Sequence, residues 1–139
     1  MSDEQTNVQR LQHGLDLFLA KDMKAWTDEL CAEDVVAEFP FAPEGSPSVI
    51  EGRTALYEYL RGYPETIDVH ELPTTTMYTT GDPDLVVMEW SVAGTVVKTG
   101  KPYAMRYAPF VTFRDGEIVT YREYWNPQVF LAALDGQGF

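Results

Sequence analysis

The stretch from Tyr121 to Pro127 is where the side chains of this sequence are best spaced for chemistry. It reads Tyr-Arg-Glu-Tyr-Trp-Asn-Pro and follows an Asp-Gly pair that favours a tight hairpin turn. Strand alternation would give one face Val119, Tyr121, Glu123 and Trp125, and the other face Ile118, Thr120, Arg122 and Tyr124. Keeping a carboxylate between two aromatic rings both ionised and shielded from water costs free energy. We therefore expect Glu123 to be solvated, paired with a cation, or tuned for proton transfer.

Glu123 is the candidate general acid or base of the sequence. Burial beside Tyr121 and Trp125 would raise the pKa of its carboxyl group toward neutral, where proton transfer is most efficient. The alternative is a strand glutamate in a structural salt bridge. The nearby cations Arg106 and Arg122 are expected to form structural ion pairs, and alternation puts Arg122 on the face opposite Glu123.

The remaining titratable candidates are weaker. His70, on a predicted strand, could exchange protons near neutral pH, but surface histidines are common. His13 lies beside the apolar face of a predicted helix. Glu38 and Glu89 are second-choice acids that outward strand positions would also explain. The two histidines are far apart in the sequence and belong to no metal-binding motif, so no metal site is predicted.

Aromatic residues are frequent enough to line a pocket for a flat or polycyclic organic molecule. The same residues could instead fill a core, and we expect roughly half of them to reach a cavity in a bent sheet covered by helices. The set is Trp26, Phe39, Phe41, Tyr59, Tyr103, Tyr107, Tyr121 and Trp125.

Bulk properties predict one globular domain spanning residues 1–139. The formal net charge of -12 disfavours nucleic acid and anionic membrane surfaces as partners. The single cysteine, Cys31, excludes an internal disulfide and fits a reducing compartment. With no readable secretion signal or apolar membrane span, the expected location is the cytoplasm.

The pattern of elements is helices first and then a meandering antiparallel sheet, so the predicted class is α+β. Ser2 and Gln5 resemble a capping box for a first helix, Asp22 caps a second one that ends near residues 33–34, and a third covers 52–61. A loop is expected over 41–51, and Asn126 and Pro127 start a last helix. Strands are predicted over 35–39, 67–72, 74–80, 85–92, 95–97 and 103–113, and after residue 116.

This order of elements resembles the SnoaL-like branch of the nuclear transport factor 2 superfamily, over nearly the whole chain. The motifs that carry the resemblance are Glu-Gly-Arg at 51–53, Gly-Asp-Pro-Asp at 81–84 and Arg-Glu-aromatic-aromatic-Asn at 122–126. The last two are most similar to the phenazine-biosynthesis A/B proteins, which are small dimeric enzymes. The resemblance implies a cone-shaped α+β barrel, a homodimer joined by the outer face of the sheet, and Glu123 as the acid/base. Tyr59 stands where the phenazine group has a histidine.

Other relatives of this fold fit less well. Ketosteroid isomerase uses an aspartate base with a tyrosine and a protonated aspartate, and the matching positions here are Phe39, Gly14 and Pro109. Limonene epoxide hydrolase has an acid matching Glu123. Its Arg-x-Asp pair falls near Trp90 and Val92 in this chain, so the complete set of its catalytic residues is absent here. The fold alone therefore decides no activity.

Three functions remain open from the sequence. The first is a cofactor-independent isomerase, cyclase or dehydratase that acts on a hydrophobic cyclic molecule, with Glu123 as acid/base and Tyr59, Tyr107 or Tyr121 as hydrogen-bond donor. The second is epoxide opening, which needs Glu38 or Glu89 within water-bridging reach of Glu123. The third is a non-catalytic ligand-binding module, in which the pocket is filled or Glu123 is neutralised by an arginine.

Overall fold

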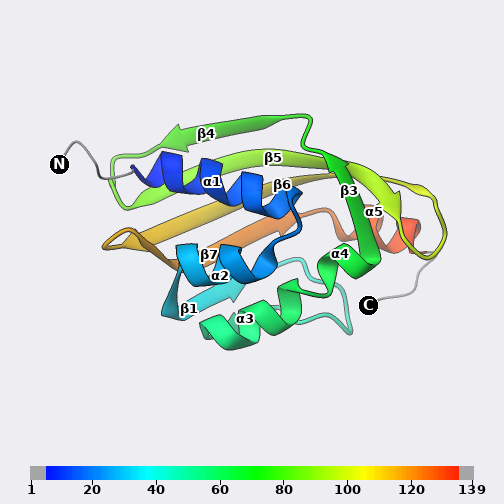
Figure 1. Ribbon diagram of the computed structural model, residues 1–139, viewed down its shortest axis with the longest axis horizontal. Coiled ribbons are helices and arrows are strands. Elements are labelled where there is room, and N and C mark those ends of the chain that lie inside the picture. Colours follow the sequence, from blue (N-terminus) through cyan, green and yellow to red (C-terminus); the bar gives the residue numbers. More distant parts are fainter. Residues whose placement is uncertain (1–5, 135–139) are drawn as a thin grey trace.

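The computed structural model describes residues 6–134 and shows helices packed on one face of a curved sheet, as the α+β prediction stated (Figure 1). The helices are α1 (Asn7–Leu19), α2 (Met23–Leu30), α3 (Arg53–Leu60), α4 (Tyr63–Thr66) and α5 (Pro127–Ala133). The strands are β1 (Cys31–Glu38), β2 (Val49–Glu51), β3 (Ile67–Glu71), β4 (Thr75–Thr79), β5 (Leu85–Val96), β6 (Pro102–Arg114) and β7 (Glu117–Trp125).

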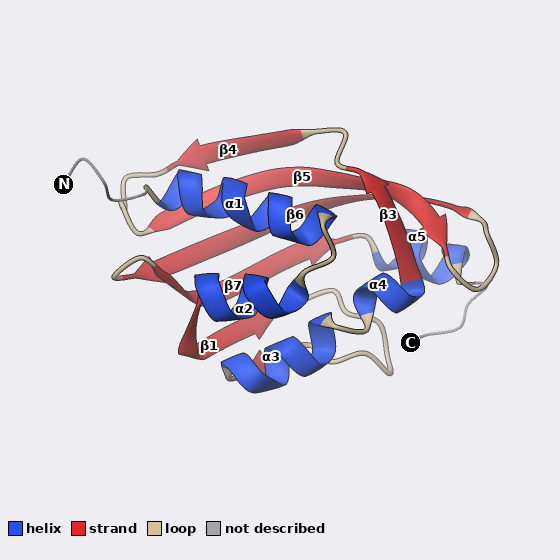
Figure 2. Cartoon of the chain, viewed as in Figure 1, coloured by secondary structure: helices blue, strands red, loops and turns tan. Residues whose placement is uncertain are grey.

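The sheet is mixed and open. Its strand order is β2-β1-β7-β6-β5-β3, and β4 pairs with the part of β5 that β3 leaves free. Neighbouring strands are antiparallel except β1 and β7, which are parallel. The helices α1, α2 and α3 lie across one face of the sheet (Figure 2). This arrangement is the α+β cone that the sequence predicted.

Side chains at the helix starts explain where the helices begin. Thr6 accepts a hydrogen bond from the backbone N–H of Gln9, and the Gln9 side chain accepts one from Thr6, so these two residues form a capping box. The box predicted at Ser2 lies outside the described residues. Asp22 and Asn126 cap α2 and α5 as predicted, the latter with Pro127 in the first turn.

Several boundaries differ from the prediction because strand pairing decided them. The first strand begins at Cys31, four residues early, since Cys31 pairs with Ile118 of β7. The predicted loop over 41–51 contains the short strand β2, which pairs with β1. The third helix ends at Leu60, close to the predicted end at residue 61, but the short helix α4 that follows it was not predicted, and Pro64 lies in its first turn.

The sequence predicted a break at residues 93–94, between strands over 85–92 and 95–97. This prediction is wrong, because β5 runs through these residues without interruption. A Cβ atom added to Gly94 would lie 2.1 Å from the backbone oxygen of Asp68 in β3. The glycine therefore permits a close approach of two strands and does not mark a turn.

Gly94→Ala is expected to lower the free energy of unfolding by about 2 kcal/mol, because backbone atoms of β3 would have to move. Urea denaturation measures the change. Gly81→Ala is the matched control, since a Cβ there meets nothing within 4 Å. A Gly94→Ala protein as stable as the control would contradict the close approach.

A bulge in β7 changes the predicted faces of that strand. Ile118 pairs with Phe113 and Thr120 with Thr112, so Val119 is an extra residue. Ile118 is consequently buried in the same cluster as Tyr121, although regular alternation put them on opposite faces. Beyond the bulge the prediction holds, because Tyr121 and Glu123 are both buried.

Two apolar clusters pack between the helices and the sheet. One is built around Val35, Leu56 and Ile118, and the other around Ile67, Trp90 and Val96. No helix within residues 6–134 is long and apolar enough to cross a membrane.

Candidate active site

A cavity lies between the helices and the concave face of the sheet. It has a volume of about 930 Å³, counting the part that opens to solvent. Every helix contributes to its lining, together with the long strands β5, β6 and β7. Apart from Glu123, the described residues that line it have apolar, aromatic or no side chains.

Glu123 is held at the cavity wall by two aromatic donors. Its side chain is on the inward face of β7 and the residue is 7% exposed. The hydroxyl of Tyr121 donates to Oε2 over 2.7 Å, and the indole Nε1 of Trp90 donates to the same oxygen over 3.1 Å. The described residues form no ion pair or hydrogen bond with Oε1. This second oxygen is therefore available to a molecule in the cavity.

Burial controls the protonation of Glu123. Loss of hydration raises the pKa of the carboxyl group from 4.5 to about 7, although the hydrogen bonds from Tyr121 and Trp90 lower it. Both groups that lower the pKa are neutral donors, and neither is a cation. Near neutral pH the group is thus divided between the acid and the carboxylate, so it can both accept and return a proton.

A second polar group in the cavity consists of tyrosine hydroxyls. The hydroxyl oxygen of Tyr107 lies 3.0 Å from that of Tyr63 and 3.4 Å from that of Tyr103. The ring of Tyr107 also stacks on Trp90, with centroids 4.8 Å apart. Burial raises the pKa of Tyr103 to about 12 and that of Tyr107 well above 10, so these hydroxyls stay protonated.

The structure brings most of the predicted aromatic residues to this cavity. Trp26 and Tyr121 meet edge to face with centroids 5.6 Å apart, and Phe39 and Tyr59 pack at 5.5 Å. The predicted residues that line the cavity are Trp26, Phe39, Tyr59, Tyr103, Tyr107, Tyr121 and Trp125.

Phe41 is the exception and lies outside the cavity lining. It follows the turn at Pro40, is 56% exposed, and packs on Tyr124 with ring centroids 5.5 Å apart. Tyr124 and Arg122 are on the outer face of the sheet, where the guanidinium of Arg122 lies 5.0 Å from the ring centre of Phe110. Arg122 is therefore directed away from Glu123, as alternation predicted, but it stacks on rings where we expected an ion pair.

The other titratable candidates are remote from the cavity. His70 contacts Asp68 at 3.3 Å and His13 contacts Glu29 at 2.9 Å, both near the surface. Glu89 accepts a hydrogen bond from Tyr78 on the exposed side of β5. Arg106 is exposed, and Glu38 is absent from the lining.

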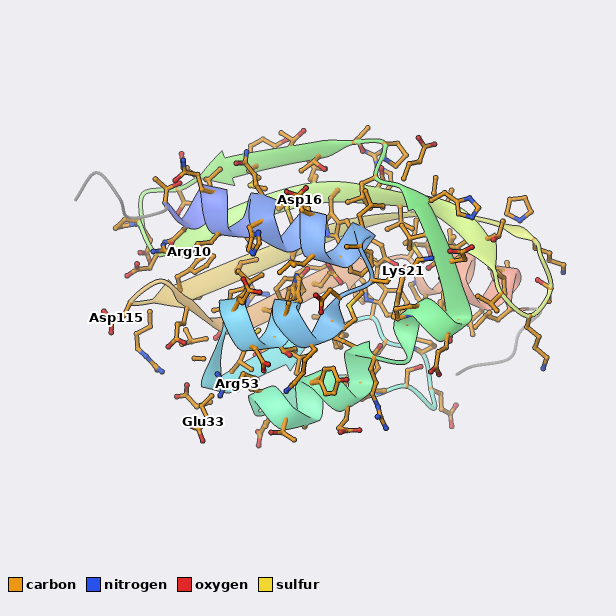
Figure 3. The ribbon with its side chains drawn as sticks, viewed as in Figure 1. Arg10, Asp16, Lys21, Glu33, Arg53 and Asp115 are labelled. Carbon is orange, nitrogen blue, oxygen red and sulfur yellow. The ribbon has the colours of Figure 1, made fainter. Side chains whose placement is uncertain are left out.

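Charged side chains gather around the outside of the molecule. Figure 3 shows this for Arg10, Asp16, Lys21, Glu33, Arg53 and Asp115. Within residues 6–134, no group of three or more histidine, cysteine, aspartate or glutamate side chains could hold a metal ion.

Two residues with polar groups in the site were not predicted to belong to it. Trp90 was noted only because the Arg-x-Asp pair of limonene epoxide hydrolase falls near it, and Tyr63 was not singled out at all. The signal for Trp90 was present, because Val86, Met88 and Trp90 alternate along β5 and are all buried. No sequence signal identified Tyr63, since its position depends on the missed helix α4.

Comparison with known proteins identifies the family. Residues 11–121 match the model of the SnoaL-like domain, which is well over half of the chain. The chain belongs to the SnoaL-like family. This match ends two residues before Glu123, so it includes Tyr59, Trp90 and Tyr107 but not the carboxyl group itself.

Relatives of this SnoaL-like protein align over most of their length. The uncharacterized protein YesE of Bacillus subtilis is 42% identical over 136 residues, which is 98% of this chain and 92% of YesE. An uncharacterized PhzA/B-like protein of Pseudomonas aeruginosa is 36% identical over 126 residues, covering 91% and 88%. A crystal structure of a candidate isomerase from Bacillus subtilis has a TM-score of 0.87 at 41% identity, covering 96% and 98%. The predicted resemblance, including the phenazine-type similarity, is confirmed.

Tyr59 stands where the phenazine-biosynthesis A/B proteins have a histidine, and this difference affects the chemistry available to this SnoaL-like chain. Its ring packs against Phe39 at the cavity wall, and burial raises the pKa of its hydroxyl to about 12. A histidine at this position could exchange protons near neutral pH, whereas a tyrosine with this pKa acts as a hydrogen-bond donor. Glu123 is thus the one group in the described lining that titrates near neutral pH.

Proposed function

We propose that this protein is a cofactor-independent enzyme of the isomerase or cyclase type, with Glu123 as general acid/base. The observation that supports this most is a buried carboxyl group that faces an apolar cavity and has no cationic partner among the described residues. Its carboxylate would take a proton from a carbon next to a carbonyl group. The electron pair left on carbon becomes the enolate, and the same carboxyl group returns the proton at another atom.

The proposed ligand is a hydrophobic cyclic molecule with a ketone group. The aromatic lining suits flat rings, and the absence of lysine, arginine and histidine from the described lining disfavours anionic ligands. Epoxide opening has less support, since neither Glu38 nor Glu89 lines the cavity beside Glu123. A non-catalytic ligand-binding module also has less support, because among residues 6–134 no arginine neutralises Glu123 and no side chain fills the cavity.

Hydrogen exchange at carbon tests this function without knowledge of the natural substrate. Cyclic aryl ketones such as 1-tetralone would be incubated with the protein in heavy water, and NMR would follow loss of the proton next to the carbonyl. We expect the protein to accelerate exchange for at least one ketone of a panel. Exchange no faster than with a heat-unfolded sample, for every ketone, would reject the proposal.

We also propose that the chain forms a homodimer through the outer face of its sheet. This face carries the aromatic residues Phe41, Phe110 and Tyr124, together with Arg122, whose guanidinium stacks on Phe110. Such an aromatic surface favours contact with a second copy.

Light scattering should give twice the chain mass of 15.7 kDa at micromolar concentration. Phe41→Glu is expected to shift the mass toward the monomer, because it places a charge in the contact. Val97→Glu, at an equally exposed residue beyond β5, serves as the control. A wild-type monomer that persists as concentration rises would exclude this dimer.

A further inference from the structure

The three tyrosine hydroxyls that meet at the cavity wall leave one hydrogen-bond donor unused. Tyr63, Tyr107 and Tyr103 supply three hydroxyl hydrogens, and the two contacts between them use two. The described residues provide no other acceptor for the third hydrogen. Since all three side chains line the cavity, this donor is available to a molecule bound there.

Tyr107 is best placed to present that donor. Its oxygen is the centre of the cluster, so it can accept from Tyr63 on one side and Tyr103 on the other. A hydroxyl that accepts two hydrogen bonds is a stronger donor, because charge that develops on its partner is spread over the network. The other tyrosines lack this support: Tyr121 already donates to Glu123, and no hydroxyl of the described residues forms a hydrogen bond with Tyr59.

The donor and the acid/base reach the same cavity from adjacent strands. Tyr107 of β6 pairs with Trp125 of β7, and Glu123 pairs with Pro109, so Tyr107 and Glu123 are diagonal neighbours on one face of the sheet. Trp90 connects them, since it stacks on Tyr107 and donates to Glu123. One small ring can therefore contact both groups at once.

We propose that Tyr107 donates a hydrogen bond to the carbonyl oxygen of an uncharged cyclic ketone, with Tyr63 and Tyr103 as positioning residues. The inference rests on the proposed function for its chemical meaning, because the same hydroxyl would stabilise the enolate that Glu123 generates. A carboxylate or phosphate group is disfavoured in this place, since the described lining supplies no cation.

A matched pair of probes separates the hydrogen bond from packing. 1-Tetralone and tetralin differ by the carbonyl oxygen, and NMR titration gives the dissociation constant of each. We expect wild type to bind 1-tetralone about tenfold more tightly than tetralin, and Tyr107→Phe to lose that preference. The carbonyl stretch of bound 1-tetralone should move to lower frequency in wild type and return in Tyr107→Phe. Tyr78→Phe, at an exposed tyrosine of β4, should change neither.

Each outcome bears on the proposal. Equal affinity of wild type for the two probes, no binding of either, or a preference that survives in Tyr107→Phe would overturn it. If Tyr107→Phe does not fold, Tyr63→Phe is the deciding variant. We expect its preference for 1-tetralone over tetralin to fall about threefold. An unchanged preference would contradict the role of the hydroxyl network. Glu123→Gln should keep the preference for 1-tetralone. In wild type, a preference for 1-tetralone without proton exchange at any ketone of the panel would reject the proposed function while leaving this binding site intact.

Discussion

Glu123→Gln is expected to lower the rate of proton exchange at a bound ketone by about a hundred- to ten-thousand-fold. The amide has nearly the same shape as the carboxyl group and can still accept hydrogen bonds from Tyr121 and Trp90. It cannot take up or release a proton in this pH range. The loss should therefore appear in the rate and not in the affinity for 1-tetralone, which NMR measures separately.

Glu89→Gln and Glu38→Gln are the matched controls for this loss. Each changes a strand glutamate that does not line the cavity, and each should exchange within a few-fold of wild type. Activity of Glu123→Gln in that same range would move the search for the acid/base away from Glu123.

The second large effect concerns stability and pH. Because burial raises the folded-state pKa of Glu123 to about 7, the folded protein binds this proton more tightly than the unfolded chain, whose pKa is near 4.5. The stabilisation is complete below about pH 4.5 and is lost as pH rises through about 7. The difference between the folded-state and unfolded-state pKa values corresponds to about 3 kcal/mol of unfolding free energy.

Glu123→Gln removes this dependence, because its amide does not titrate. Relative to wild type, the variant should gain about 3 kcal/mol of stability between pH 4 and pH 9, as measured by urea denaturation at each pH. Glu33→Gln, altered at an exposed residue of β1, should show no comparable gain. A constant difference between Glu123→Gln and wild type over this range would mean that Glu123 has an ordinary pKa in the folded state.

The fold was largely predictable because local signals and the family resemblance agreed. Caps at Asp22 and Asn126, turns after residues 80 and 114, and alternation in β5 and β6 define elements that the structure contains. The errors occur where tertiary contacts override local signals. Gly94 was placed between two predicted strands but permits the close approach of β3, and the bulge at Val119 is fixed by pairing with β6.

The candidate site was predictable only in part. Glu123 and its neighbour Tyr121 stand out from the sequence because they are close together and alternate on one strand. The contact of Trp90 with Glu123 joins residues 33 positions apart, and the Tyr63–Tyr107 contact joins residues 44 apart. Such pairs have no local pattern, so the donors that hold Glu123 and the hydroxyl network became visible only in the folded chain.

A carbon-13 NMR titration of the Glu123 side chain is the most direct test of the proposed acid/base role of this residue. The carboxyl carbon would be labelled, assigned by its absence in Glu123→Gln, and followed from pH 4 to pH 9. We expect an apparent pKa of about 7, as burial against Trp90 and Tyr121 implies. An apparent pKa at or below 4.5 would show a carboxylate that is solvated or paired with a cation, and would contradict its role as the acid/base of this cavity.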